Sequence, residues 1–185
     1  MQNCLIDRDC NFDCSALTQG GIGNYVILVN KDDWDAGTVT IDTGVTEEIT
    51  SIVLDTGKEG YAFEGSKESN IIPSTAQREV DGMDGFDHQI DIKVFDVSQL
   101  SRENIAKMRF NKVVAVIPLN NGKALCMGKD VGMRMSGYVH IPGDASLSNL
   151  IQFILKTPAD GAPEIATEHV IASTFDITTL LTAAP

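Results

Sequence analysis

Residues 113–133 read VVAVIPLNNGKALCMGKDVGM, in which an apolar run is followed by turn-forming residues and a second apolar segment. Val113 to Ile117 form a continuous apolar run, which is typical of a buried strand. Asn121 and Gly122 accept positive φ, so they predict the two central positions of a tight turn. The segment from Ala124 to Met127 is then expected to return antiparallel. The stretch therefore predicts a β-hairpin.

Similar β-rich segments recur on both sides of this hairpin, separated by glycine, asparagine and aspartate. Together with the hairpin they predict ten short strands, at Tyr25–Val29, Thr38–Ile41, Glu48–Leu54, Tyr61–Gly65, Gln89–Phe95, Val113–Pro118, Ala124–Gly128, Met133–His140, Leu150–Lys156 and His169–Ile177. Ten strands at this spacing indicate a mainly β protein, either a β-sandwich or a partly closed barrel.

One good helix is expected, in the segment SQLSRENIAKMRFN from Ser98 to Asn111. Ser98 or Ser101 can cap its first amides, and Lys107 and Arg109 suit the negative end of the helix dipole. Its apolar residues form a rough stripe that would lie on a sheet: Leu100, Ile105, Met108 and Phe110. The helix is therefore expected to flank the β-structure.

The composition predicts one β-rich domain at residues 20–185, preceded by an N-terminal extension at residues 1–19. The chain has 185 residues, of which 43% are hydrophobic, enough for a sizeable core. The sequence MQNCLIDRDCNFDC at the start has no basic region or apolar run, so we expect neither a signal peptide nor a membrane anchor. Its cysteines, Cys4, Cys10 and Cys14, are expected to be reduced thiols.

The net charge of −12 excludes a large surface for binding nucleic-acid phosphates. Such a charge suits instead a wall along which a polyanion moves without adhering, because each contact is repulsive.

Acidic residues and one histidine gather in TAQREVDGMDGFDHQIDIKVFDVS, residues 75–98. Asp81, Asp84 and Asp87 repeat every third residue, whereas a calcium loop of the EF-hand type requires oxygen ligands at every second position. Asp91 alternates with apolar neighbours, so it is expected to face away from the apolar side of a strand that His88 enters. We interpret the cluster as a solvated or interfacial hairpin edge.

Three other segments and two histidines are candidates for binding or catalytic sites, and each fits a structural role better. NKDDWDAG, residues 30–37, is interpreted as a turn anchored by Trp34. GGIGNY at residues 20–25 precedes a strand instead of following one, and GKDVGM at residues 128–133 lacks the spacing of a phosphate loop. His140 and His169 have no nucleophile partner. We therefore expect no catalytic residue, no cofactor and no metal site, and we expect that the protein is not an enzyme.

The order of the elements resembles tail tube, or major tail, proteins of tailed bacteriophages that infect Bacteroidota. The resemblance covers residues 20–154 and rests on GGIGNYVILVNKDDW, GYAFEGSKES, HQIDIKVF, one helix and VVAVIPLNNGKALCMGKDVGM. It implies a β-sandwich or partly closed barrel with one flanking helix, assembled as hexameric rings that stack into a tube. It further implies a long hairpin arm, in which Tyr61–Gly65 and Gln89–Phe95 flank a loop at residues 67–87.

In this interpretation the loop contacts neighbouring subunits, and its candidate contact residues are Lys67, Glu68, Asn70, Ile71, Ile72, Arg78, Asp81, Asp84, Phe86 and Asp87. The implied partners are further copies of the chain, the tape measure protein, and the tube terminator or baseplate. Genomic DNA would pass without specific binding, and no membrane is involved. The protein would be made in the cytoplasm of the bacterial host and would reside in the virion tail.

Three alternatives remain. A capsid decoration protein or a head–tail connector would form trimers or a single ring of fixed copy number. A metal-dependent enzyme or calcium-binding module would use Asp81, Asp84, Asp87 and His88. A carbohydrate-binding sandwich would use Trp34 and Tyr61 as stacking platforms, although one tryptophan and three tyrosines are a poor supply for that role.

Overall fold

A computed structural model of the chain describes residues 22–43, 48–64, 71–80, 83–94, 98–140 and 151–183. The expected N-terminal extension at residues 1–19, with three of the four cysteines, lies outside these ranges.

The described residues form a mainly β protein, which confirms the predicted fold class. Its strands are β1 (Tyr25–Asn30), β2 (Thr38–Ile41), β3 (Ile49–Val53), β4 (Tyr61–Glu64), β5 (Ile71–Val80), β6 (Met83–Val94), β7 (Val113–Pro118), β8 (Ala124–Met127), β9 (Arg134–His140), β10 (Ile151–Lys156) and β11 (His169–Ile171). The helices are α1 (Lys31–Ala36), α2 (Gln99–Lys107) and a 3-10 helix, Ile177–Leu181. Within these ranges no helix is long and apolar enough to cross a membrane.

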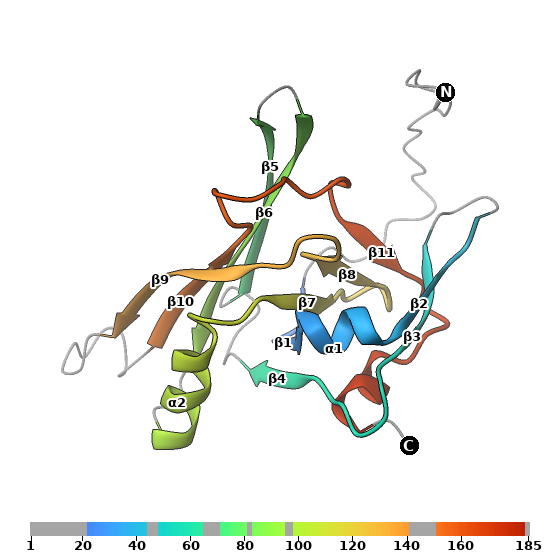
Figure 1. The fold of residues 1–185 in the computed structure, drawn as a ribbon. Coiled ribbons are helices and arrows are strands. Elements are labelled where there is room, and N and C mark those ends of the chain that lie inside the picture. Colours follow the sequence, from blue (N-terminus) through green and yellow to red (C-terminus); the bar gives the residue numbers. More distant parts are fainter. Residues whose placement is uncertain are drawn as a thin grey trace.

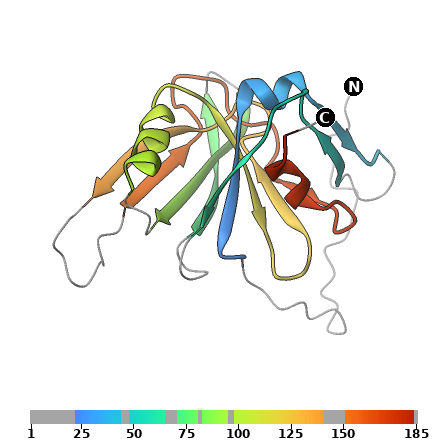
Figure 2. The same cartoon turned by 90° about the horizontal axis from the view of Figure 1, so that it is seen from below.

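The strands form two sheets (Figures 1 and 2). A seven-stranded sheet of order β2-β3-β11-β8-β7-β1-β4 curls into a half-barrel, and a second sheet has the order β5-β6-β10-β9. The pairing is antiparallel except between β3 and β11. Helix α2 flanks the structure beside β9, as the sequence predicted for its one good helix (Figure 1).

The central strands of the larger sheet are buried on both faces. On β1, Val26 and Leu28 join the core between the two sheets, whereas Ile27 and Val29 join a second core behind the larger sheet. Strand β7 divides in the same way, because successive side chains of a strand point to opposite faces. This double burial explains the continuous apolar runs in these strands.

The predicted β7–β8 hairpin is confirmed, but its turn lies one residue earlier than expected. The amide of Gly122 donates to the carbonyl of Leu119 at 3.1 Å, so Asn120 and Asn121 occupy the centre of the turn. Gly122 follows the turn with φ +81°, and the Leu119 amide bonds the Lys123 carbonyl at 2.8 Å. The left-handed glycine therefore acts as a bulge that restores the strand pairing.

Helix α2 begins as predicted, because the Ser98 hydroxyl accepts a hydrogen bond from the Ser101 amide at 3.2 Å. Ile105 and Met108 are buried, whereas Phe110 is 78% exposed and lies beyond the helix. The described side chains of the expected stripe therefore contact the core only in part.

The expected turn at residues 30–37 is instead the short helix α1. Asp32 and Asp33 lie in its first turn, where carboxylates favour the positive end of a helix, and Lys31 pairs with Asp35 one turn later. Trp34 is 4% exposed in the second core, so its predicted anchoring role is confirmed.

The expected arm is built differently from the prediction. Strand β4 pairs with β1 in the larger sheet, so it does not flank the arm. The arm is the β5–β6 hairpin, with ten residue pairs from Ile71↔Ile92 to Val80↔Met83. Residues 71–80 are therefore a strand and not part of a loop. The sequence pattern does not predict this strand, because β5 is an edge strand with polar exposed positions. An edge strand also tolerates Pro73.

The last predicted strand is also shorter than expected, since β11 ends at Ile171. Residues that follow lead into the 3-10 helix, whose Leu180 is buried in the second core.

Candidate functional site

The arm is held from one side by residues 157–168, which we call the strap. Backbone hydrogen bonds of 2.9 Å join Phe86 to Glu164 in both directions. The Thr75 hydroxyl lies 3.1 Å from a carboxylate oxygen of Glu168. In Figure 1 the strap crosses the arm, and the described ends of β5 and β6 extend past it. The arm is therefore braced by its own chain beyond its middle.

Arg78 ties the arm to the strap through its guanidinium group. Its two terminal nitrogens donate to the carbonyls of Pro158 at 3.0 Å and Gly161 at 2.9 Å. Its Nε lies 3.1 Å from Oδ1 of Asp87, an ion pair without hydrogen-bond geometry. Lys156 lies 3.5 Å from the other oxygen of the same carboxylate. Asp87 is thus neutralised inside its own chain.

Glu164 is the best-satisfied buried carboxylate of the strap. Glu164 is only 1% exposed. Its oxygens accept three backbone hydrogen bonds, from Asp130 at 2.9 Å, Val131 at 2.9 Å and Gly132 at 3.1 Å. Burying a carboxylate is costly unless such bonds replace its water. The carboxylate therefore locks the strap onto the loop between β8 and β9.

The loop that receives Glu164 is the segment GKDVGM, which the sequence suggested only as a poor phosphate loop. Gly128 and Gly132 adopt φ of +75° and +80°, and the successive amides between them converge on one point. Such a concave set of amides is an anion-binding nest. In this protein the anion is the side chain of Glu164.

His88 is also buried, at 1% exposure, and both of its ring nitrogens are used by the backbone. Its Nδ1 accepts from the Gly128 amide at 2.9 Å, so the proton lies on Nε2, which donates to the Ala166 carbonyl at 3.0 Å. This arrangement requires the neutral ring. His88 therefore joins β6, the nest loop and the strap, and no ring nitrogen faces Asp84 or Asp87.

The remaining titratable groups near the nest have pKa values that are shifted by burial and by neighbouring charges. Burial raises the pKa of the Cys126 thiol far above its ordinary value, which keeps it protonated and a poor nucleophile. Burial and the nearby charge of Lys129 lower the pKa of His169. Burial raises the pKa of Asp130, but the hydrogen bond and charge of Lys129, together with smaller contributions from His169 and the Ile165 backbone, outweigh this effect and the net shift is downward. Among the described residues no group of three metal-ligating side chains converges.

The ten candidate contact residues fall into distinct environments. Ile72 and Asp84 are exposed, and Phe86 is half-buried beside the strap. Ile71 is 2% exposed in the core of its own chain, so it offers no surface to a neighbour. Arg78 and Asp87 form the internal ion pair. The other four lie outside the described residues: Lys67, Glu68, Asn70 and Asp81.

Sequence reasoning missed Glu164 and the inward position of His88. The signal for His88 was present, because His88, Ile90, Ile92 and Val94 share one parity of β6 and all four are buried. Glu164 has no comparable signal, since its partners are backbone amides more than thirty residues away.

The strap packs tightly against the arm at Gly85, and replacement of this glycine tests that contact. A Cβ at this position would lie 2.6 Å from Pro163 side-chain atoms and 2.7 Å from the Glu164 carbonyl. We expect Gly85→Ala to lower the free energy of unfolding by about 1–3 kcal/mol, because the backbone must shift. Urea denaturation measures this value.

The matched control is Gly161→Ala in the same strap, where the nearest atom to a new Cβ lies 3.8 Å away. It should change the free energy of unfolding little. Equal stability of the two variants would contradict the close packing of the strap on Gly85.

Open sheet edges are the other candidate functional feature. In the described part of the chain, β2 and β4 end the larger sheet, and β5 and β9 end the smaller one. Large exposed apolar side chains lie on three of these strands: Tyr61 on β4, Ile72 on β5, and Tyr138 and Val139 on β9, at 48%, 48%, 47% and 51% exposure. Unpaired edges with apolar side chains favour pairing with another chain.

In comparisons with known proteins, no protein-family model, curated protein or solved structure matches the chain.

Proposed function

We propose that this protein is a structural subunit of a bacteriophage tail tube, whose copies associate into stacked, hexameric rings around a lumen that conducts DNA. The observation that carries the proposal is the set of open edges on β4, β5 and β9 with their exposed apolar side chains. In an isolated protein such edges are a liability, whereas in a closed ring they pair with the next subunit.

The braced arm supports the same proposal. Arg78, His88 and Glu164 fasten the middle and outer part of the β5–β6 hairpin within the chain. A hairpin held in this way reaches a neighbour without the entropy cost of ordering a free loop on contact. The arm therefore suits a repeated contact in a rigid assembly.

The net charge of the chain supports a lumen that conducts DNA. A net charge of −12 repels a polyanion, so DNA passes without adhering to the wall. In this proposal the partners are other copies of the chain, the tape measure protein, and the tube terminator or baseplate. The protein resides in the virion tail and is made in the cytoplasm of the bacterial host.

Negative-stain electron microscopy of the purified protein at high concentration tests the proposal. We expect rings with a central lumen, and tubes of stacked rings as the concentration rises, because each subunit contact is repeated around the axis. Size-exclusion chromatography with light scattering gives the copy number. Monomers at every concentration would refute assembly, trimers would favour a capsid decoration protein, and single rings that never stack would favour a head–tail connector.

A further inference from the structure

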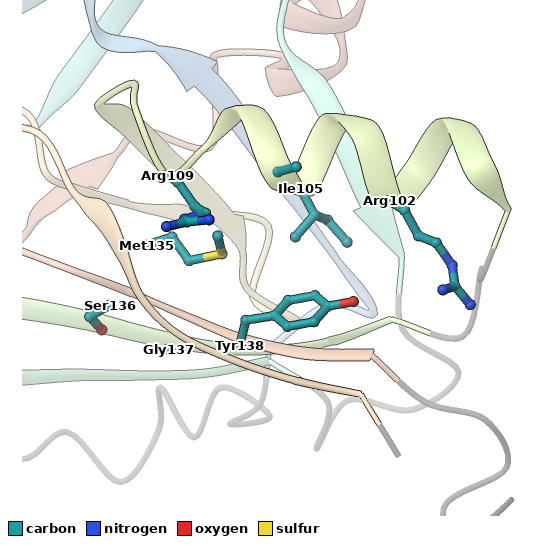
Figure 3. Close-up of a pocket in the computed structure, with 8 residues that line it drawn as sticks. Arg102, Ile105, Arg109, Met135, Ser136, Gly137 and Tyr138 are labelled. Atoms are coloured by element: carbon teal, nitrogen blue, oxygen red, sulfur yellow. The ribbon is translucent and has the colours of Figure 1, made fainter. Parts of the chain in front are cut away.

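A groove between α2 and β9 carries the opposite sign of charge to the whole chain. Its volume is about 510 Å³. Figure 3 shows Arg102 of α2 and Arg109, which follows the helix, toward the two ends of the groove, with Ile105, Met135 and Tyr138 between them. These two arginines are the charged residues among the eight described residues that line it, in a chain of net charge −12. The groove thus offers an apolar floor between two cations, which fits an acidic segment of extended chain.

Two acidic residues near the described end of the arm form no ion pair with another residue that the structure describes. Glu79 and Asp84 are exposed and lie directly opposite each other across β5 and β6. Like charges in this arrangement repel and weaken the hairpin. A cation supplied by a second copy would therefore relieve this repulsion.

The groove and the end of the arm lie at opposite ends of the molecule. In Figure 1 the arm rises to the top of the view and α2 lies at the bottom, and in Figure 2 the molecule is seen from the α2 end. A copy therefore cannot place its own arm in its own groove. A contact between two different surfaces is heterologous, and its repetition generates a ring or an open stack.

We propose that the end of the β5–β6 arm, through Glu79 and Asp84, docks in the α2–β9 groove of a second copy, where Arg102 and Arg109 bind the two carboxylates. The inference rests on the proposed function, because it names the contact that stacks one ring on the next. The strap keeps the arm extended, and the groove supplies both charge and apolar surface to its end.

Two double charge reversals test this contact. The groove variant is Arg102→Glu with Arg109→Glu, and the arm variant is Glu79→Lys with Asp84→Lys. We expect each variant alone to need a concentration higher by roughly tenfold or more before tubes sediment, because like charges then meet at every contact. An equal mixture of the two should form tubes again, since each arm then finds a groove of opposite charge.

The matched control is Arg134→Glu with Lys93→Glu, which changes the net charge as much as the groove variant but alters no residue that lines the groove. It should form tubes like the wild type. Circular dichroism before assembly checks that each variant is folded. We expect folding, because substitutions at surface positions usually change stability little. Tube formation by the wild type should also weaken as sodium chloride is raised.

The outcomes separate the inference from the proposed function. Tubes that form equally well from the wild type and the groove variant would overturn the groove contact and leave the tube subunit standing. A wild type that forms neither rings nor tubes would overturn both. Folded single variants that fail to assemble and do not recover in the mixture would show that the arm and groove are not partners.

Discussion

Replacing Glu164 with alanine is expected to lower the free energy of unfolding by about 3–5 kcal/mol. The wild-type carboxylate is buried and accepts the amides of Asp130, Val131 and Gly132. Alanine leaves these three donors without their carboxylate acceptor in a largely buried site, and each unsatisfied buried donor costs about 1–3 kcal/mol. Chemical denaturation followed by circular dichroism measures the loss.

Small carboxylates should restore part of this stability, because Glu164→Ala leaves an empty anion-binding nest. Formate or acetate that binds the folded variant alone raises its midpoint of unfolding by mass action. Sodium chloride at the same ionic strength is the control for salt. A melting temperature that rises equally in chloride and formate would contradict a specific carboxylate site.

Glu168→Ala in the same strap is the matched control, because this glutamate contacts Thr75 at the partly exposed edge of the arm. We expect it to cost about 1 kcal/mol or less and to show no recovery with formate. If Glu164→Ala were no more destabilising than Glu168→Ala, the result would contradict the role of the nest in holding the strap.

Replacing Phe153 with alanine is expected to lower the free energy of unfolding by about 3–5 kcal/mol as well, for a different reason. Phe153 lies on β10 with 0% exposure, in the core between the sheets. Its ring meets Phe63 of β4 edge-on, with centroids 5.8 Å apart, so it joins the two sheets. Alanine leaves a cavity where both sheets meet, and calorimetry or urea unfolding measures the effect.

Phe110→Ala is the control for Phe153→Ala, because the same atoms are removed from a ring that is 78% exposed. Its stability should stay within about 0.5 kcal/mol of the wild type. A similar loss in both variants would contradict the assignment of Phe153 to the inter-sheet core.

The fold class followed from local patterns that the structure retains. The apolar runs of β1 and β7 predicted buried strands, and Ser98 predicted the start of α2. The failures lie where a local pattern is compatible with two structures. Residues 71–80 have the polar surface of an edge strand and were interpreted as a loop, and residues 31–36 have turn-forming aspartates that also suit the first turn of a helix.

The candidate site was harder to predict than the fold. The spacing of Asp81, Asp84 and Asp87 argued against a calcium loop, and the structure pairs Asp87 with Arg78 and leaves Asp84 exposed. The Arg78 contacts to Pro158 and Gly161 span about eighty residues of chain, so no local pattern reveals them. The proposed tube function remains a prediction for microscopy to test.

Local sequence patterns establish that this chain is mainly β, where its buried strands lie and where its flanking helix begins. These features depend on side-chain periodicity and on capping within a few residues. The pairing of β4 with β1 and of β5 with β6, and the entry of Glu164 into the nest after β8, become visible only in the folded chain. The reason is that strand partners and buried hydrogen bonds are selected by the free energy of long-range contacts, which no short segment contains.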